Sequence, residues 1–370
     1  MIVYEQRSTA FIPPPIVHPT LSTPNRSLQL DGTASHFGKA PRAMCEPIGA
    51  SLAGIKSNTA AENESMRRKL VLVTCAAIVG PLLHTAAYAA PPSAPPAPQT
   101  RTYVSGTGSD SNACTVSAPC KTFQAALALT VAGGEIYVLN SANYGAVTIN
   151  KSVSITSEGA VAGVLATSGS AIAINAGPND VINLRGLVID GGNTGSTGIQ
   201  FTAGQALNIQ KTTVRNFTNA GVSFTPTTAS TISASELIVT GNANNGIMIS
   251  SASTAVSGVL SKVMSTKNGV GVLINGATAN VTVTDSVSSN NNYGVGSSAS
   301  AVMVRNSTLS SNAVGLTADQ SAIVRIGQST ITANGVGSTA TNGGLVQSYG
   351  NNNIVGNTSN GTLSSTLALQ

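Results

Sequence analysis

The sequence contains no tryptophan, and charged residues make up only 8% of its 370 residues. The formal net charge of +5 belongs mostly to the first 89 residues. Residues 90–370 have ten Lys or Arg against eight Asp or Glu, which leaves +2. A nearly neutral chain without a basic cluster is a poor partner for nucleic acid. Histidine is absent after His84, which removes the commonest metal ligand from the same stretch.

The first part of the chain lacks the periodicity of a folded domain. Residues 1–65 carry proline clusters and no apolar face. Residues 66–89 then follow the order of a secretory signal peptide: a basic start, an apolar run and small residues at a cleavage site. We therefore predict that Met66 is the initiator, that residues 1–65 are an over-extended leader, and that the protein is secreted or enters the cell envelope.

Two other interpretations of residues 66–89 are weaker. A transmembrane anchor needs about 20 apolar residues, and this apolar run is shorter, so we expect no membrane span in the mature chain. Lipid attachment at Cys75 is disfavoured because no small residue precedes this cysteine.

Cys114 and Cys120 are the cysteines that remain after signal cleavage, and they follow a Pro-rich stretch, 90–101, that is typical of an extended linker. With five residues between them in an exported chain, they most simply form a local disulfide. A metal pair is the alternative, but two thiolates without a histidine make a poor zinc site.

From Gly198 onward one short unit recurs. A glycine followed by an apolar residue marks it at nearly even intervals: Gly198-Ile199, Gly221-Val222, Gly246-Ile247, Gly271-Val272, Gly294-Val295 and Gly315-Leu316, with Gly337-Ser338 a degenerate last copy. Within each unit, apolar residues alternate with small polar ones over short runs, which is a strand pattern. A repeat of this length built from short strands predicts a solenoid whose coils pair at about 4.8 Å.

Three columns of residues at the coil spacing support this prediction. Asn268, Asn290, Asn312 and Asn334 predict a ladder of hydrogen-bonded side chains. Phe201, Phe224, Ile249 and Ile274 predict an inward column that fills a narrow core. Lys211, Glu236, Lys262, Asp285 and Arg305 alternate in sign, which indicates either a column of opposite charges on one face or independently placed surface charges.

The repeat resembles the right-handed parallel β-helix proteins of the pectin-lyase-like superfamily. Further segments carry the likeness over roughly residues 102–361: Tyr103-Val-Ser-Gly-Thr-Gly-Ser-Asp110, Pro119-Cys120-Lys121-Thr122-Phe123, Ile189-Asp190-Gly191-Gly192 and Tyr349-Gly-Asn-Asn-Asn-Ile354. We therefore predict an all-β fold over residues 102–370, a three-sided parallel β-helix of nine or ten coils.

An N-terminal helix is expected to cap the first coil. Phe123, Ala126, Leu127 and Val131 fall on one helical face, Thr122 suits the N-cap, and Gly133-Gly134 suits the end. Such a helix would cover the strand edges that a first coil exposes.

The resemblance implies carbohydrate chemistry without indicating a reaction. Enzymes of this superfamily place acids, calcium ligands and basic residues on adjacent coils, and glycoside hydrolysis needs two carboxylates about 5 to 10 Å apart. Paired-Asp, Gly-His-Gly and Arg-x-Pro-x-x-Arg motifs are absent from the sequence, and Asp190 has Arg215, not an acid, one coil later.

One set of acids keeps an enzymatic interpretation open. Glu135, Glu158 and Asp180 follow one another at almost the spacing of the repeat and would line up if the first coils keep the register. Aligned carboxylates would suit acid–base chemistry or calcium; the alternative is that they are solvated corner residues. The catalytic candidates are therefore Glu158, Asp180 and Asp190, and no cofactor other than calcium is indicated.

Aromatic platforms for sugars are scarce. In residues 90–370, the aromatic residues outside the expected core and cap are scattered: Tyr103, Tyr137, Tyr144, Phe217, Tyr293 and Tyr349. A shallow groove lined by Asn, Ser and Thr is the form that a glycan site would take. The first hypothesis is an exported, non-catalytic surface, adhesion or glycan-binding module whose partner is a polysaccharide or cell-surface glycan. The second is a polysaccharide-active enzyme, a pectate-lyase-like lyase or glycoside hydrolase, with a non-standard site.

Overall fold

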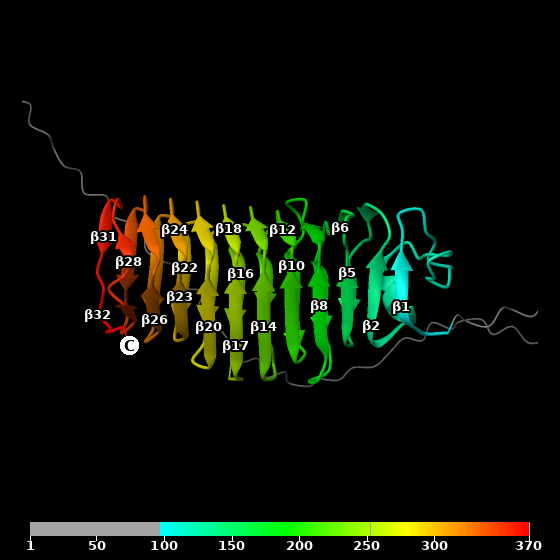
Figure 1. Ribbon diagram of the computed structural model, residues 1–370, viewed down its shortest axis with the longest axis horizontal. Helices are drawn as coiled ribbons and strands as arrows, with labels where there is room; N and C mark the ends of the chain where they lie inside the picture. Colours follow the sequence, from blue (N-terminus) through cyan, green and yellow to red (C-terminus); the bar gives the residue numbers. More distant parts are fainter. Residues whose placement is uncertain (1–96, 252, 370) are drawn as a thin grey trace, which may run out of the picture. The chain divides into compact units, whose positions relative to one another are not determined.

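The computed structural model describes residues 97–369, apart from Ala252. The predicted leader, the signal peptide and most of the Pro-rich linker lie outside the described residues. Within them the chain winds into three parallel sheets, each built from one strand of every coil, so that neighbouring strands come from successive coils (Figure 1). This confirms the predicted all-β fold, a three-sided parallel β-helix of about ten coils.

We name the three sheets A, B and C in the order in which each coil visits them. Sheet A contains β1 (Gln99–Val104), β2 (Thr130–Val138), β5 (Val153–Thr156), β8 (Val181–Arg185), β11 (Ala206–Gln210), β14 (Ser230–Ser235), β17 (Val256–Ser261), β20 (Ala279–Thr284), β23 (Ala301–Arg305), β26 (Ile323–Gly327), β29 (Leu345–Ser348) and β32 (Ser365–Thr366). Sheet B contains β3 (Ala142–Asn143), β6 (Ala162–Leu165), β9 (Leu187–Asp190), β12 (Thr213–Arg215), β15 (Ile238–Thr240), β18 (Met264–Thr266), β21 (Val287–Ser289), β24 (Thr308–Ser310), β27 (Thr330–Thr332) and β30 (Asn353–Ile354). Sheet C contains β4 (Val147–Ile149), β7 (Ser170–Asn175), β10 (Thr197–Ala203), β13 (Ala220–Phe224), β16 (Asn245–Ser250), β19 (Val270–Asn275), β22 (Tyr293–Ser298), β25 (Val314–Asp319), β28 (Val336–Ala340) and β31 (Ser359–Gly361).

The core is a set of stacked apolar columns inside the coils. Phe201 pairs in register with Phe224, which pairs with Ile249, which pairs with Ile274, and all four side chains are buried. The rings of Phe201 and Phe224 stack with centroids 4.5 Å apart. The predicted inward column is therefore confirmed, and its burial contributes to the stability of the coils.

The recurring glycines are required by close packing between coils. A Cβ atom on Gly271 would lie 2.6 Å from the carbonyl oxygen of Gly294 and 2.9 Å from Nδ2 of Asn291. Atoms cannot approach so closely, so a larger residue would push adjacent coils apart. The spacing of the glycines thus records the coil length, as the sequence indicated.

The asparagine ladder exists, but its second predicted member, Asn290, is one residue too early. Nδ2 of Asn268 donates to Oδ1 of Asn291 (3.2 Å), Nδ2 of Asn291 donates to Oδ1 of Asn312 (3.1 Å), and the chain of bonds runs from Asn242 to Asn357. Asn290 instead occupies a corner with a left-handed φ of 57°. The coils before and after it differ in length, so a constant spacing selects the wrong asparagine.

The predicted charge column is also displaced at its last member. Lys211, Glu236, Lys262 and Asp285 occupy equivalent corners between sheets A and B, all with left-handed φ. The next corner residue is Asn306, whereas Arg305 belongs to β23 and pairs with Thr284. None of the ion pairs found among residues 97–369 joins two members of this column. The column is therefore an alignment of corners and not a chain of salt bridges.

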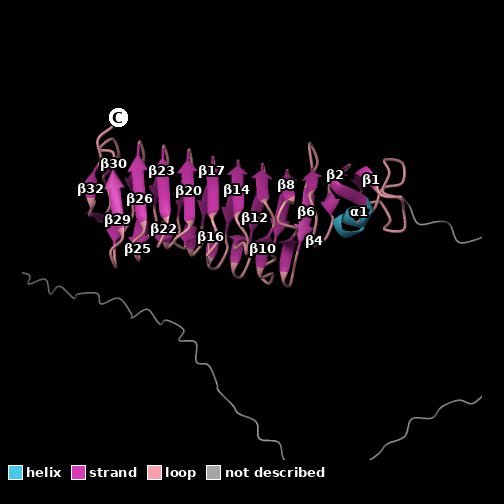
Figure 2. Cartoon of the chain, turned by 90° about the horizontal axis from the view of Figure 1, so that it is seen from below, coloured by secondary structure: helices cyan, strands magenta, loops and turns pink. Residues whose placement is uncertain are grey.

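Helix α1 (Phe123–Leu129) lies at the first coil, beside β1 and β2 (Figure 2). As predicted, Oγ1 of Thr122 accepts a hydrogen bond from the backbone N–H of Ala125, and Phe123, Ala126 and Leu127 are buried. The helix ends at Leu129 and not at Gly133, because Thr130 takes an extended backbone conformation (φ −84°, ψ 133°) and begins β2. Val131, predicted on the helical face, therefore lies in the strand.

The segment that contains both cysteines covers the outer edge of β1. Cys114 and Cys120 form a disulfide. The N–H of Tyr103 donates to the carbonyl of Cys114 (2.8 Å), and the carbonyl of Tyr103 accepts from the N–H of Cys120 (3.0 Å). Because β1 starts at Gln99, the strand takes in residues 99–101, which the sequence assigned to the linker. An edge that would otherwise be free to pair with other chains is thus occupied.

Candidate functional site

The three acids proposed as catalytic lie at three different corners of the coils. Glu158 follows β5 at the corner between sheets A and B, Asp180 precedes β8 at the corner between sheets C and A, and Asp190 ends β9 at the corner between sheets B and C. The three therefore do not share one groove. Among residues 97–369, no three His, Cys, Asp or Glu side chains come together to hold a metal ion.

Of the two interpretations of Glu135, Glu158 and Asp180, the structure contradicts the alignment. Glu135 pairs in register with Ser154, and Ser154 pairs with Asn183. The acids fall elsewhere because the loops that join the sheets in the first coils differ in length, so a similar count of residues ends on a different sheet or corner.

Asp180 closes the loop before β8. Its carboxylate accepts hydrogen bonds from Oγ of Ser152 (2.6 Å) and from the backbone N–H of Gly177 (2.7 Å). The bond from Ser152, which outweighs partial burial, and the bond from Gly177 lower the pKa of Asp180. A general acid needs a raised pKa, so this environment suits a structural carboxylate.

Asp190 is held in a similar way. Burial raises its pKa, but hydrogen bonds from the N–H of Gly192 (2.9 Å), Nδ2 of Asn216 (3.1 Å) and Nε of Arg215 (2.7 Å) outweigh burial and lower the pKa overall. The carboxylate thus joins two coils at a corner and stays ionised at neutral pH.

A concave surface lined by polar side chains lies on the outward face of sheet A, over β2, β5, β8 and β11. It is an open groove with a volume of about 410 Å³. Two columns line it, each made of residues paired from coil to coil: Glu135, Ser154, Asn183 and Asn208 in the first, and Thr156, Arg185 and Gln210, continued by Tyr137, in the second. We call this surface, with Arg101 and Tyr103 on β1, the sheet A groove.

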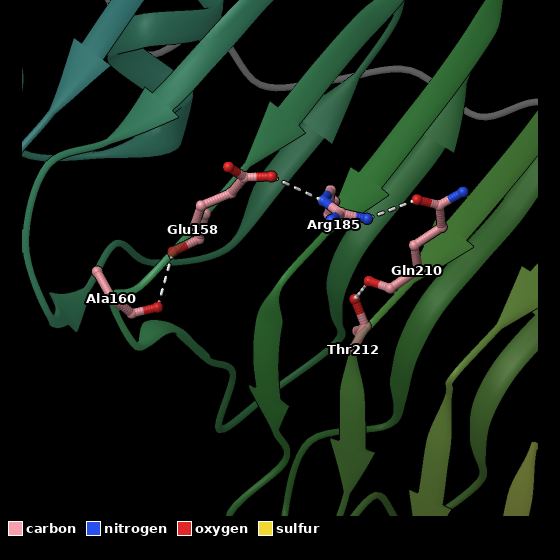
Figure 3. A network of polar contacts seen from close by, with 6 residues as sticks. Glu158, Ala160, Arg185, Gln210 and Thr212 are labelled. Carbon is pink, nitrogen blue, oxygen red and sulfur yellow. Dashed lines mark hydrogen bonds and ion pairs between the residues drawn. The ribbon is translucent and has the colours of Figure 1, made fainter.

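Hydrogen bonds fix the side chains of the groove along the coil axis. In the first column, Nδ2 of Asn208 donates to Oδ1 of Asn183 (2.8 Å), and Nδ2 of Asn183 donates to Oγ of Ser154 (3.0 Å). In the second column, Arg185 donates from Nε to Oε1 of Glu158 (3.2 Å) and from Nη1 to Oε1 of Gln210 (2.8 Å) (Figure 3). The groove therefore presents polar groups whose positions are set before any ligand binds.

Two tyrosines that looked scattered in the sequence are neighbours at one end of the groove. Tyr103 on β1 pairs in register with Tyr137 on β2, and their rings meet edge to face with centroids 6.3 Å apart. The guanidinium of Arg101 lies 5.5 Å from the centre of the Tyr137 ring and donates from Nε to Glu135 (2.7 Å). Half-buried tyrosines beside polar columns combine an apolar ring surface with hydrogen-bonding groups.

The other aromatic candidates do not form a comparable surface. Tyr144 and Phe217 are buried, Tyr293 lies on sheet C, and Tyr349 follows β29. A second shallow groove, of about 420 Å³, follows the corner between sheets B and C above the asparagine ladder, and Lys267 is its charged residue. No tyrosine lines this second groove, whereas the half-buried Tyr103 and Tyr137 continue a column of the sheet A groove, which is therefore the stronger candidate.

Most residues of the groove were not predicted from the sequence, although the sequence holds a signal for them. Asn183 and Asn208, like Arg185 and Gln210, are separated along the sequence by the length of one coil. Asn183 and Arg185 lie upstream of the regular glycine pattern, which begins at Gly198, so their register is set by strand pairing and not by a repeated residue.

Comparison with known proteins adds a likeness of fold. The sequence matches no family model and no curated protein. Among solved structures, the chain is similar to the crystal structure of pectate lyase Pel9A, with a TM-score of 0.48 and 14% sequence identity over 74% of this chain and 79% of that chain. The three parallel sheets described above agree with the parallel β-helix expected from the sequence.

Among residues 97–369, no helix is long and apolar enough to cross a bilayer.

Proposed function

We propose that the protein is an exported, non-catalytic β-helix that binds a glycan through the sheet A groove. The observation that carries the proposal is the tyrosine pair, Tyr103 and Tyr137, at the head of two ordered columns of amide, hydroxyl and guanidinium groups. Sugars present apolar C–H faces that pack on aromatic rings and hydroxyl groups that both donate and accept hydrogen bonds.

The geometry of the columns favours a polymer over a small molecule. Asn183 and Asn208, and likewise Arg185 and Gln210, repeat at the coil spacing of about 4.8 Å along one line. An extended chain laid along the coil axis would meet the same kinds of group at each step. The groove is also open, whereas small ligands are usually enclosed in a pocket.

Export is supported by a sequence pattern and by a structural feature. The pattern is the predicted signal peptide at residues 66–89, which lies outside the described residues and remains a prediction. The disulfide between Cys114 and Cys120 fits an oxidising compartment.

The alternative, a polysaccharide-active enzyme that uses Glu158, Asp180 and Asp190, has weaker support. These acids lie at three corners, and each accepts a hydrogen bond from a serine or arginine side chain of a neighbouring coil. A site that uses all three would need them to face one sugar.

The test is binding of the purified protein to a panel of soluble polysaccharides, measured by affinity electrophoresis and calorimetry with and without calcium. We expect binding that Tyr137→Ala weakens at least tenfold. Tyr293→Ala, which removes an exposed ring from sheet C, is the matched control and should bind normally. Release of reducing ends or unsaturated products, abolished by Asp180→Ala, would establish the enzyme instead. Absence of binding to every polysaccharide would reject the glycan site.

A further inference from the structure

We propose that the sheet A groove selects neutral glycans, because two carboxylates of the chain itself, Glu135 and Glu158, occupy the guanidinium groups that would otherwise bind acidic sugars. The inference rests on the proposed function and adds the class of glycan and the residues that determine it.

The first guanidinium belongs to Arg101, at the tyrosine end of the groove. Both Nε and Nη2 of Arg101 contact Oε2 of Glu135, and Nε lies 2.7 Å from this oxygen. The hydrogen bond that Arg101 donates to Glu135, followed by the negative charge of Glu135, raises the pKa of Arg101. Because Glu135 lies on β2 in register with Arg101, strand pairing itself keeps the two side chains together.

The second guanidinium belongs to Arg185, in the middle of the groove. It lies between Oε1 of Glu158 and Oε1 of Gln210, which accept from Nε and Nη1 (Figure 3). Arg185 pairs with Thr156, and Thr156 pairs with Tyr137, so this guanidinium is on the line that a ligand over Tyr137 would follow.

The two ion pairs make the charged part of the groove neutral. A uronic acid would have to displace Glu135 or Glu158 from an existing charge-assisted hydrogen bond, and it would then face the displaced carboxylate. A neutral sugar needs no such exchange, because Asn183, Asn208 and Gln210 offer it amide groups. The described residues also lack a cluster of acids through which calcium could bridge to an acidic polymer.

Removal of each acid is the test, with a matched control elsewhere on the coils. Glu135→Gln and Glu158→Gln each remove the negative charge that neutralises one arginine of the groove, Arg101 or Arg185. Asp190→Asn frees Arg215 on sheet B and changes the net charge equally, but outside the groove. Binding of oligogalacturonate is compared with binding of cello-, xylo- and laminari-oligosaccharides at low and high salt, and thermal melting confirms that each variant folds.

For the unmodified protein we expect measurable affinity for at least one neutral oligosaccharide and weaker affinity for oligogalacturonate. In Glu135→Gln and Glu158→Gln, the ratio of acidic to neutral affinity should rise about fivefold at low salt, the size of an exposed ion pair, and return at high salt. Asp190→Asn should leave the ratio unchanged. In Glu158→Gln combined with Arg185→Gln, the gain should disappear.

Three results would overturn the inference while leaving glycan binding in place. They are tighter binding of oligogalacturonate by the unmodified protein, no change of the ratio in either glutamine variant, and an equal gain in Asp190→Asn. Failure to bind any oligosaccharide would instead reject the proposed function, and the inference with it.

Discussion

Replacing Asn291 by alanine would interrupt the asparagine ladder in its middle. This side chain is buried and takes part in five hydrogen bonds. Its Nδ2 donates to Oδ1 of Asn312, to Oγ of Ser288 and to the carbonyl of Ser265, each at 3.1 Å, and its Oδ1 accepts from the backbone N–H (2.8 Å) and Nδ2 (3.2 Å) of Asn268.

The size of the effect follows from the groups left without partners. The N–H of Asn268 is buried and loses its acceptor, which alone costs about 1–3 kcal/mol. The other bonds are lost in the same buried place, so we expect the free energy of unfolding to fall by about 3–5 kcal/mol. At about 2 °C per kcal/mol for a domain of this size, Tm should fall by about 6–10 °C.

Asn290→Gly provides the control from the adjacent position. Asn290 lies in a corner with φ of 57°, a conformation that glycine adopts without strain, so the change should cost less than about 1 kcal/mol. Thermal and urea unfolding followed by circular dichroism measure both variants, and hydrogen exchange tests whether protection is lost at Asn268. If Asn290→Gly destabilised the protein as much as Asn291→Ala, the assignment of the ladder would be refuted.

Three further changes test other parts of the fold. Replacing Cys114 and Cys120 together by alanine opens a loop of about seven residues, so stability should fall by about 2.4 kcal/mol, and size-exclusion chromatography should show self-association through the uncovered edge of β1. Phe224→Ala should cost about 3–5 kcal/mol in denaturant unfolding, because the ring is buried against Phe201; a loss below about 1 kcal/mol would contradict the stacked core. The folded-state pKa values of Asp180, Asp190, Asp285 and Asp319 are lowered, so their stabilisation is complete above the unfolded value of about 3.9 and is lost as pH falls through the folded values. Melting temperatures should therefore stay level between about pH 5 and 8 and drop below about pH 4, and a decline that begins near pH 6 would speak against this assignment.

The architecture could be predicted from the sequence because the packing between coils requires the same type of residue at the same position in each successive coil. Gly271 and its equivalents have no room for a Cβ atom, and Phe224 must meet Phe201 inside the coil, so both constraints appear as a period in the chain. Position within a coil was less predictable. Corners differ slightly in length, which moved the predicted ladder from Asn291 to Asn290 and the last charged corner from Asn306 to Arg305.

The candidate site was harder to predict for a related reason. A binding surface on a β-helix is a set of residues that strand pairing brings together, and in the first coils no repeated residue marks the pairing. Tyr103 and Tyr137 lie further apart in the sequence than one regular coil, because the disulfide loop and α1 are inserted between their strands. Their contact is therefore invisible at the period of the repeat. The acids gave the opposite error: the regular spacing of Glu135, Glu158 and Asp180 suggested a line, whereas Glu135 lies in β2 and the other two lie at different corners.

Strand β1 connects the disulfide loop, residues 114–120, to the sheet A groove. One edge of this strand bonds to the backbone of the disulfide loop at Tyr103, and the other edge pairs with β2, so that Arg101 and Tyr103 stand over Glu135 and Tyr137. A strand at the end of a solenoid would fray without a partner on its outer side, and the groove would lose its aromatic end with it. The disulfide loop therefore does more than block edge-to-edge association. It holds in place the strand on which the proposed recognition of a sugar ring depends.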